Sequence, residues 1–291
     1  MKVVRYALSG SATPKVGRCD DGEVRPVDVG SMAELLRLDV PAIQRLLDRA
    51  GSATPVLDPR LLPPVDGRTE VWAAGNTSHP SLCAHKAEST QPSVYDLVYE
   101  ADRPELFFKA PAWRVVTDGE PIALRADSHN SVPEPELALV LTAGGEVAGY
   151  TVCDDVSSRS IEAANPLYLA QAKVYDGSCA LAAGWRPAWE VADPYDLTIR
   201  VVVVREGAVV WTGATSTSTL HRRLDRLVEH LRRELSFPDG AVLSTGTGLV
   251  PALAFSLCPG DVVTIAIDEV GQLRTPTAAG RSVREGVALS R

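Results

Sequence analysis

Glu134 and Glu136, near the middle of the chain, have the type and spacing of a cation-binding pair. A proline precedes each glutamate and keeps the backbone extended, so we expect both carboxylates on one face of a strand. Two such charges about 4 Å apart repel by about 4 kcal/mol at an effective dielectric constant of about 20. A buried strand cannot absorb this without a proton or a counter-charge, and a divalent cation is a natural counter-charge.

The next apolar strand is expected to bring further acids to the same place. Residues 149–153 lead into Asp154 and Asp155, and a hairpin through residues 143–146 would place them beside the two glutamates. Lys173 follows later in the chain. We therefore expect carboxylates from two paired strands to converge on one site.

The residue types around this site indicate which metal it would hold. No Cys-x-x-Cys or His-x-x-x-His spacing accompanies the acids, so an all-oxygen site for Mg²⁺, Mn²⁺ or Ca²⁺ is favoured over a Zn²⁺ site. The alternative is an exposed edge strand whose glutamates are merely solvated. The alternating leucines Leu137, Leu139 and Leu141 argue instead for a buried strand.

Length and charge restrict the class of protein. The chain has 291 residues, enough for a sizeable core, and a formal net charge of −8 without a basic cluster, which argues against a nucleic-acid or membrane surface. Its five cysteines are scattered among apolar neighbours, as in a protein with free thiols. The polar N-terminus and the lack of a long apolar run predict a cytoplasmic protein.

The first 65 residues are expected to form a small α+β domain, and residues 66–291 the catalytic domain. Residues 1–28 predict a small β-unit, and a helix follows with Ser31 as its N-cap and an interruption at Pro41. Residues 58–64, which are rich in proline, are interpreted as the linker.

The remainder of the chain is expected to be dominated by strands, with one amphipathic helix over residues 220–235. The strands are expected at residues 69–73, 106–109, 121–124, 137–141, 147–152, 197–205, 209–211, 241–244 and 262–267.

Four motifs, in order, resemble those of the fumarylacetoacetate hydrolase superfamily over roughly residues 68–280. They are Glu134-Pro135-Glu136, the run GYTVCDDVSSR at residues 149–159, Ala172-Lys173 and Thr245-Gly246-Thr247. The resemblance implies a β-dominated α+β fold, a mixed β-roll, usually found as a homodimer.

The resemblance also implies roles for particular residues. Glu134, Glu136 and Asp155 would bind Mg²⁺ or Mn²⁺, and Lys173 would be the active-site lysine. Arg159 and Thr247 match positions that contact the substrate or hold water.

Within the superfamily the chain is most similar to the branch that contains 2-keto-3-deoxy-D-arabinonate dehydratase. The similarity lies in RPELFFK at residues 103–109, RADS at 125–128 and EAANPLYL at 162–169. Glu105, in the first of these, matches an acid implicated in dehydration. The chain departs from the branch at Ser78, His85 and Ser160, where a tyrosine, an arginine and an aspartate are expected.

The implied function is dehydration of a 2-keto-3-deoxy sugar acid, or a related 2-keto acid, through an enolate that the cation stabilises. Beside the cation, Lys173 is expected to have a lowered pKa and to act as base or proton shuttle. Glu105 is the first candidate for the acid that protonates the departing hydroxyl, and Glu88 the second.

Two other functions stay open. In a C–C bond hydrolase, His85 and Glu88, three residues apart, would activate water; a decarboxylase or tautomerase for an acylpyruvate-like substrate would use the same cation. The second possibility is a protein of the same fold that binds a keto acid without turnover. Its motivation is the set of departures at Ser78, His85 and Ser160.

Overall fold

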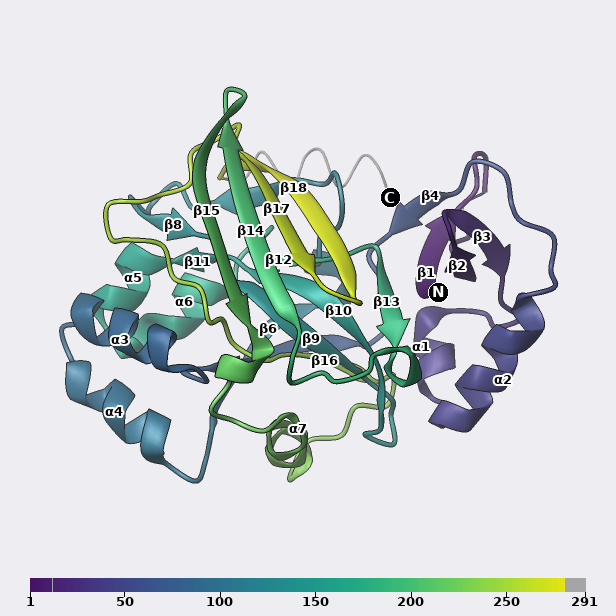
Figure 1. Ribbon diagram of the computed structural model, residues 1–291, viewed down its shortest axis with the longest axis horizontal. Helices are drawn as coiled ribbons and strands as arrows, with labels where there is room; N and C mark the ends of the chain where they lie inside the picture. Colours follow the sequence, from purple (N-terminus) through teal and green to yellow (C-terminus); the bar gives the residue numbers. More distant parts are fainter. Residues whose placement is uncertain (12, 281–291) are drawn as a thin grey trace.

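Two sheets of very different size make up most of the molecule (Figure 1). The computed structural model describes residues 1–11 and 13–280. Within them the large sheet has eleven strands, in the order β3-β2-β1-β13-β10-β9-β16-β5-β6, with β12 paired to β10 and β4 paired to β1. The second sheet has the order β15-β14-β17-β18-β7, and β8 and β11 form a small pair. The β-dominated, mixed fold expected from the sequence is confirmed.

The strands of the large sheet are β1 (Lys2–Ala7), β2 (Lys15–Asp20), β3 (Glu23–Pro26), β4 (Arg60–Leu62), β5 (Glu70–Gly75), β6 (Glu105–Pro111), β9 (Pro135–Leu141), β10 (Val147–Asp155), β12 (Cys179–Leu181), β13 (Gly184–Pro187) and β16 (Ala241–Ser244). The other strands are β7 (Ile122–Leu124), β8 (Ser131–Val132), β11 (Ser157–Ser158), β14 (Thr198–Arg205), β15 (Ala208–Ser216), β17 (Val262–Ile267) and β18 (Gly271–Ala279).

The helices are α1 (Met32–Leu36), α2 (Val40–Ala50), α3 (His79–Glu88), α4 (Pro92–Glu100), α5 (Arg159–Ala164), α6 (Leu169–Lys173) and α7 (Leu224–Arg232). Short 3₁₀ turns are η1 (Ala112–Arg114), η2 (Pro166–Tyr168), η3 (Ala188–Glu190) and η4 (Thr217–Thr219).

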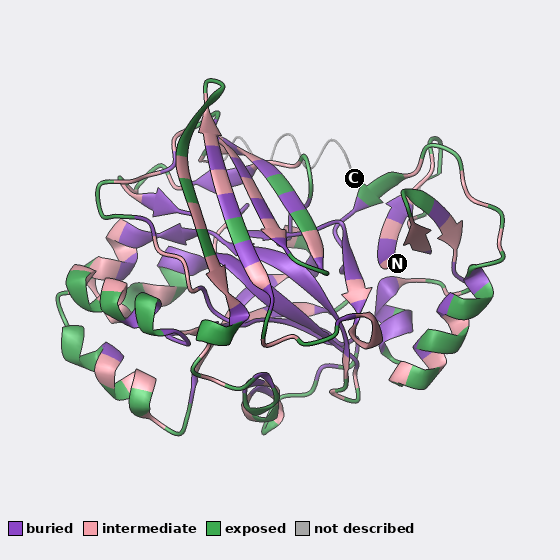
Figure 2. Cartoon of the chain, in the orientation of Figure 1, coloured by how far each residue is buried: buried purple, intermediate pink, exposed green. Residues whose placement is uncertain are grey.

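Strand β9 is buried on both faces, which explains its nearly continuous apolar sequence. Leu137, Leu139 and Leu141 pack into the core shared with β14 and β17, whereas Ala138 and Val140 face the core shared with α1 and α2. Figure 2 shows this central part of the large sheet as buried. Strand β9, which contains Glu136 and directly follows Glu134, is therefore packed against core residues on both faces.

The first 65 residues are joined to the rest of the chain through the large sheet. Val3 of β1 lies opposite Trp185 of β13, and Arg5 lies opposite Leu62 of β4. The segment expected to be only a linker therefore contains a strand, because its backbone pairs with the part of β1 that β13 leaves open. The division of the chain at residue 65 stays a prediction.

The helix expected near Ser31 is two helices. Ser31 caps α1, since its side chain accepts a hydrogen bond from the backbone N–H of Glu34 at 3.1 Å. Asp39 caps α2 in the same way through Ala42 at 2.8 Å, which places Pro41 in the first turn, where proline is tolerated. The expected interruption at Pro41 is thus the start of a new helix.

Two further expectations can be compared with the structure. All five cysteines are free. Across residues 1–11 and 13–280, the helices all fall short of the length and apolar character needed to cross a bilayer.

Candidate active site

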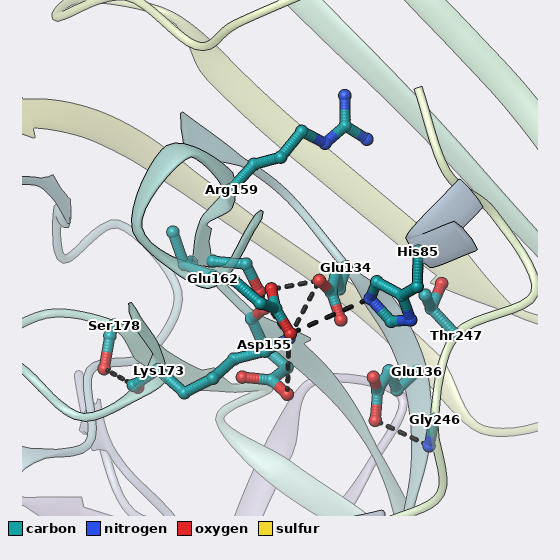
Figure 3. Close-up of polar contacts among 12 residues, drawn as sticks. His85, Glu134, Glu136, Asp155, Arg159, Glu162, Lys173, Ser178, Gly246 and Thr247 are labelled. Carbon is teal, nitrogen blue, oxygen red and sulfur yellow. Dashed lines mark hydrogen bonds and ion pairs between the residues drawn. The ribbon is translucent and has the colours of Figure 1, made fainter. Parts of the chain in front are cut away.

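The β9–β10 hairpin brings the three predicted acids together, as Figure 3 shows. Glu136 lies opposite Cys153, so Asp155 projects beside the glutamates two residues further on. One ligand atom each from Glu134, Glu136 and Asp155 can be chosen so that all lie within 4.8 Å of one another. The convergence expected from the sequence is therefore observed. Asp154 points elsewhere, and its carboxylate accepts the backbone N–H of Glu134 at 3.0 Å.

Glu136 is buried, as is Asp155, whereas Glu134 is only half-buried. Glu136 Oε2 accepts hydrogen bonds from Ser244 Oγ at 2.6 Å and from the backbone N–H of Gly246 at 2.8 Å. Burial, followed by the charges of Asp155 and Glu134, raises the pKa of Glu136 well above its usual range. A divalent cation would remove this penalty, and three carboxylates suit Mg²⁺, so the residues present fit the expected metal.

Two buried lysines hold the other two acids in place. Lys109 Nζ lies 2.5 Å from Asp155 Oδ1 and donates to the carbonyl oxygens of Val156 and Lys173. Lys173 Nζ donates to Glu134 Oε1 at 2.8 Å and to Ser157 Oγ at 2.6 Å. Contacts of this kind orient the groups that would bind a metal.

The expected lowering of the pKa of Lys173 is not found among the protein groups alone. Burial disfavours its ammonium form, but the charges of Asp155 and Glu134 outweigh burial and hold the pKa of Lys173 well above its usual range. The sequence-based argument counted the cation and not the acids that surround the lysine. A cation on the same acids would oppose their effect.

Glu105 lines the same cavity as these acids. It belongs to β6 and is paired with Gly75 of β5, where a Cβ would overlap the Glu105 carboxylate. Asn76 Nδ2 donates to Glu105 Oε2 at 2.7 Å. Burial raises the pKa of Glu105, which favours the protonated form needed in an acid.

The cavity between these groups is small. Its lining includes Glu105, Lys173, His85, Glu162 and the three acids of the cluster, and its volume is about 10 Å³. That is room for about one water molecule. A keto acid is larger, so its binding requires some of the lining side chains to move.

His85 and Glu88 are both on α3 but have different partners. His85 Nδ1 lies 2.8 Å from Asn76 Oδ1, and its Nε2 lies 3.7 Å from Glu162 Oε1. Glu88 Oε2 instead pairs with Arg159 Nε at 3.1 Å. Burial raises the pKa of Glu88, partly offset by Arg159. The His–Glu pair that a hydrolase would use is thus divided between two other contacts.

Arg159 and Thr247 lie at the edge of the site. The Arg159 guanidinium points away from the three acids in Figure 3 and donates to the carbonyl oxygens of Pro251 and Ala252. Thr247 lines the cavity, and its Oγ1 donates to the Pro135 carbonyl at 3.1 Å. Ser78, where a tyrosine was expected, donates to the Thr247 carbonyl at 2.7 Å and caps α3.

Three residues that contribute to the site had been given no role from the sequence: Lys109, Asn76 and Glu162. For Lys109 a signal existed, since a lysine that directly follows the apolar run Leu106-Phe107-Phe108 in a buried strand requires a buried partner. Asn76 and Glu162 could not be found in this way, because their partners come from distant segments.

Comparison with known proteins decides the family. The family described as "Fumarylacetoacetate (FAA) hydrolase C-terminal" matches residues 82–278, more than half of the chain.

The chain belongs to the fumarylacetoacetate hydrolase family.

It is therefore an enzyme of this family, as the motifs implied. A relative from Haloferax volcanii, "Probable 2-keto-3-deoxyxylonate dehydratase", is 43% identical over 249 residues, which cover 84% of this chain and 86% of the relative. The "2-dehydro-3-deoxy-D-arabinonate dehydratase" of Saccharolobus solfataricus is 40% identical over 230 residues, or 78% of this chain and 77% of the relative.

A solved structure of the family is also similar throughout. It is described as "2-keto-3-deoxy-D-arabinonate dehydratase complexed with magnesium and 2,5-dioxopentanoate". The TM-score is 0.83 and the identity 34%, with 96% of this chain and 99% of that chain covered. Another relative, "Oxaloacetate tautomerase fahd2, mitochondrial" from Xenopus laevis, is 25% identical over 304 residues, which cover 95% of this chain and 90% of the relative.

Proposed function

We propose that this protein is a Mg²⁺-dependent dehydratase of a 2-keto-3-deoxy sugar acid or a related 2-keto acid. The observation that carries the proposal is that Glu105, a buried acid with a raised pKa, lines the same cavity as the cluster Glu134, Glu136 and Asp155. The two relatives at 40% identity or more support it, because both are named as dehydratases of such acids.

The three acids of the cluster would hold the cation, with Mn²⁺ as the other possibility. When bound, Mg²⁺ supplies a Lewis acid that makes the proton on C3 of a 2-keto acid easier to remove. Lys173, which donates to Glu134 and Ser157, would move that proton.

Glu105, which lines the same cavity, would give its proton to the departing C4 hydroxyl, which leaves as water. Thr247 at the cavity wall and Arg159 behind it would position the substrate. Glu88, the second candidate acid, is committed to Arg159 and is better placed to hold that guanidinium than to reach a hydroxyl.

The hydrolase alternative is less well supported by the site. It needs a pair that activates water, but His85 contacts Asn76 and Glu162, while Glu88 contacts Arg159. A screen of 2-keto-3-deoxy acids and acylpyruvates with Mg²⁺, followed by NMR, tests the choice. Water loss from the former supports the proposal, and cleavage of the latter alone would overturn it. Turnover of neither, in a protein that binds Mg²⁺, would favour a keto-acid binding protein.

We also propose that the protein is cytoplasmic and forms a homodimer, and that residues 1–65 are a structural unit without catalytic groups. The side chains that line the cavity all come from residue 74 or later, which supports the last point. Light scattering on the purified protein tests the dimer, and cell fractionation tests the location.

A further inference from the structure

The side chain of Asn76 bridges Glu105 and His85, two cavity-lining residues from different elements of the chain. Asn76 follows β5 and has a left-handed backbone, with φ of 50°, a conformation that asparagine tolerates better than most residues. The residue is 4% exposed. Its Nδ2 donates to Glu105 Oε2 at 2.7 Å, and its Oδ1 lies 2.8 Å from His85 Nδ1.

The orientation of this amide determines where His85 carries its proton. Glu105 Oε2 accepts from the Asn76 NH₂ group, and it can do so whether or not Oε1 carries a proton, so the amide turns its oxygen toward His85. The amide oxygen of Asn76 can only accept a hydrogen bond. His85 must therefore donate from Nδ1, and a neutral imidazole that is protonated on Nδ1 has no proton on Nε2.

The rest of the ring's surroundings fix the direction in which Nε2 points. The ring of Tyr95 stacks on His85 with 5.1 Å between centroids and an interplanar angle of 24°. His85 Nε2 then faces Glu162 Oε1 at 3.7 Å, too far for a direct hydrogen bond. Both residues line the same cavity.

We propose that Asn76 is a positioning residue whose amide makes His85 a hydrogen-bond acceptor for a hydroxyl group of the substrate. His85 Nε2 and a carboxylate oxygen of Glu162 are both hydrogen-bond acceptors, so the space between them suits a group that can donate a hydrogen bond. A sugar-acid hydroxyl is such a donor, whereas a ketone or carboxylate oxygen at this place would face two acceptors without a hydrogen bond.

This inference rests on the proposed function, since only a hydroxylated keto acid has such a group. The inference goes beyond the proposed function because it assigns the recognition of a hydroxyl group to the Asn76, His85 and Glu162 side chains. A site that hydrogen-bonds a substrate hydroxyl rejects the analogue that lacks it, because its polar groups are then left unpaired.

The first test needs no substrate. Nitrogen-15 NMR of the full-length, Mg²⁺-loaded protein at pH 8 reports which ring nitrogen of His85 is protonated, with the signals assigned by their loss in a His85→Gln variant. We expect the Nδ1–H form in the wild type and in Asn76→Asp, whose side chain still accepts from Nδ1.

In Asn76→Ala, His85 should change to the Nε2–H form, since the Glu162 carboxylate is then the acceptor that remains beside the ring. Asn130→Ala also removes one asparagine amide, in this case one that donates to the Leu253 carbonyl, and as the matched control it should leave the tautomer unchanged. An Nε2–H ring or an imidazolium in the wild type, or an unchanged tautomer in Asn76→Ala, would overturn the proposal.

The second test is kinetic. On an accepted 2-keto-3-deoxy acid, Asn76→Ala should raise KM at least 10-fold, while Asn76→Asp should keep KM within about 3-fold of the wild type whatever its kcat. The wild type should discriminate at least 100-fold in kcat/KM against an analogue that lacks the hydroxyl beyond C4, and Asn76→Ala should lose most of this discrimination. A purely structural role for Asn76 would lower thermal stability and leave the discrimination intact, which contradicts the proposal.

The two tests separate this inference from the proposed function. If no 2-keto-3-deoxy acid is dehydrated but the tautomer depends on Asn76, the proposed function fails and the assignment of His85 as an acceptor stands. If dehydration occurs and the tautomer ignores Asn76, the inference fails and the function stands.

Discussion

Lys109 Nζ lies 2.5 Å from Asp155 Oδ1, and both side chains are almost completely inaccessible to solvent. Lys173 holds Glu134 in a similar way, at 2.8 Å. Glu136, by contrast, has neutral donors, Ser244 and Gly246, as its hydrogen-bonding partners in the described part of the chain. The cluster is thus partly neutralised by protein groups, and Glu136 is the acid that gains most from a cation.

Changing Glu136 to Gln should abolish turnover and remove most of the stabilisation by Mg²⁺. A cation that binds only the folded state adds about 2.7 kcal/mol at 100 times its Kd, and the variant should lose most of this gain. Calorimetry with and without Mg²⁺ measures it. Glu206→Gln, at an exposed turn, is the control and should keep the full shift. An equal Mg²⁺ shift in Glu136→Gln would place the cation elsewhere.

Changing Lys109 to Met should destabilise the protein by about 3 kcal/mol, because it removes the lysine nearest to the buried Asp155 and leaves Lys173, 3.6 Å away, as the remaining cationic partner. The loss should be smaller in saturating Mg²⁺, since the cation supplies a new counter-charge. Urea unfolding under both conditions tests this, with Lys86→Met, which breaks an exposed pair with Asp96, as the control near zero. A small loss without Mg²⁺ would mean that Lys109 does not balance Asp155.

Glu105 and His85 should respond differently to substitution. Glu105→Gln should lower kcat by about 100-fold or more, in the range for a lost general acid. His85→Ala should act mainly through KM, because His85 is expected to bind the substrate and not to activate water. Steady-state kinetics of both variants on one accepted keto acid provide the test. A His85 variant with no measurable kcat, beside an active Glu105 variant, would favour the hydrolase.

Asp239 should make the stability of the protein depend on pH. Its carboxylate accepts from Arg37 and Arg68, and the side-chain hydrogen bond with Arg68 contributes most to holding the pKa of Asp239 well below its usual range. A group with a lowered folded pKa stabilises the protein above its unfolded pKa of about 4, and this contribution is lost as the pH falls toward the folded value.

Asp239→Asn should therefore cost about 1–2 kcal/mol at pH 7, between the values for an exposed and a buried pair because both arginines are largely exposed, and less at pH 3, where part of the contribution is lost. Denaturant unfolding at the two pH values measures the difference. An equal loss of unfolding free energy at both pH values would show that the charge of Asp239 does not stabilise its contact with Arg37 and Arg68.

The sequence was most informative where a local pattern determines the structure. Proline before each of Glu134 and Glu136, alternating leucines and a glycine turn predicted the β9–β10 hairpin, and the hairpin register then brings Asp155 to the glutamates. The cap at Ser31 was predicted for the same reason, since its partner is three residues away.

What could not be predicted depends on contacts between distant segments. The bridge from Glu105 to His85 through Asn76 joins β6, α3 and the end of β5, and no periodicity in the sequence indicates it. The pairing of Glu88 with Arg159 has the same origin, and it separated two residues whose spacing suggested a pair. Strand β4 was overlooked because its pairing with β1 spans more than fifty residues.

The mass of the product tests the central claim most directly. The wild-type enzyme would be incubated with Mg²⁺ and a 2-keto-3-deoxy pentonic acid, and the products identified by mass spectrometry. A dehydratase gives one product that keeps every carbon and is lighter than the substrate by one water. Two carbon fragments, or one product that has lost carbon dioxide, would contradict the account.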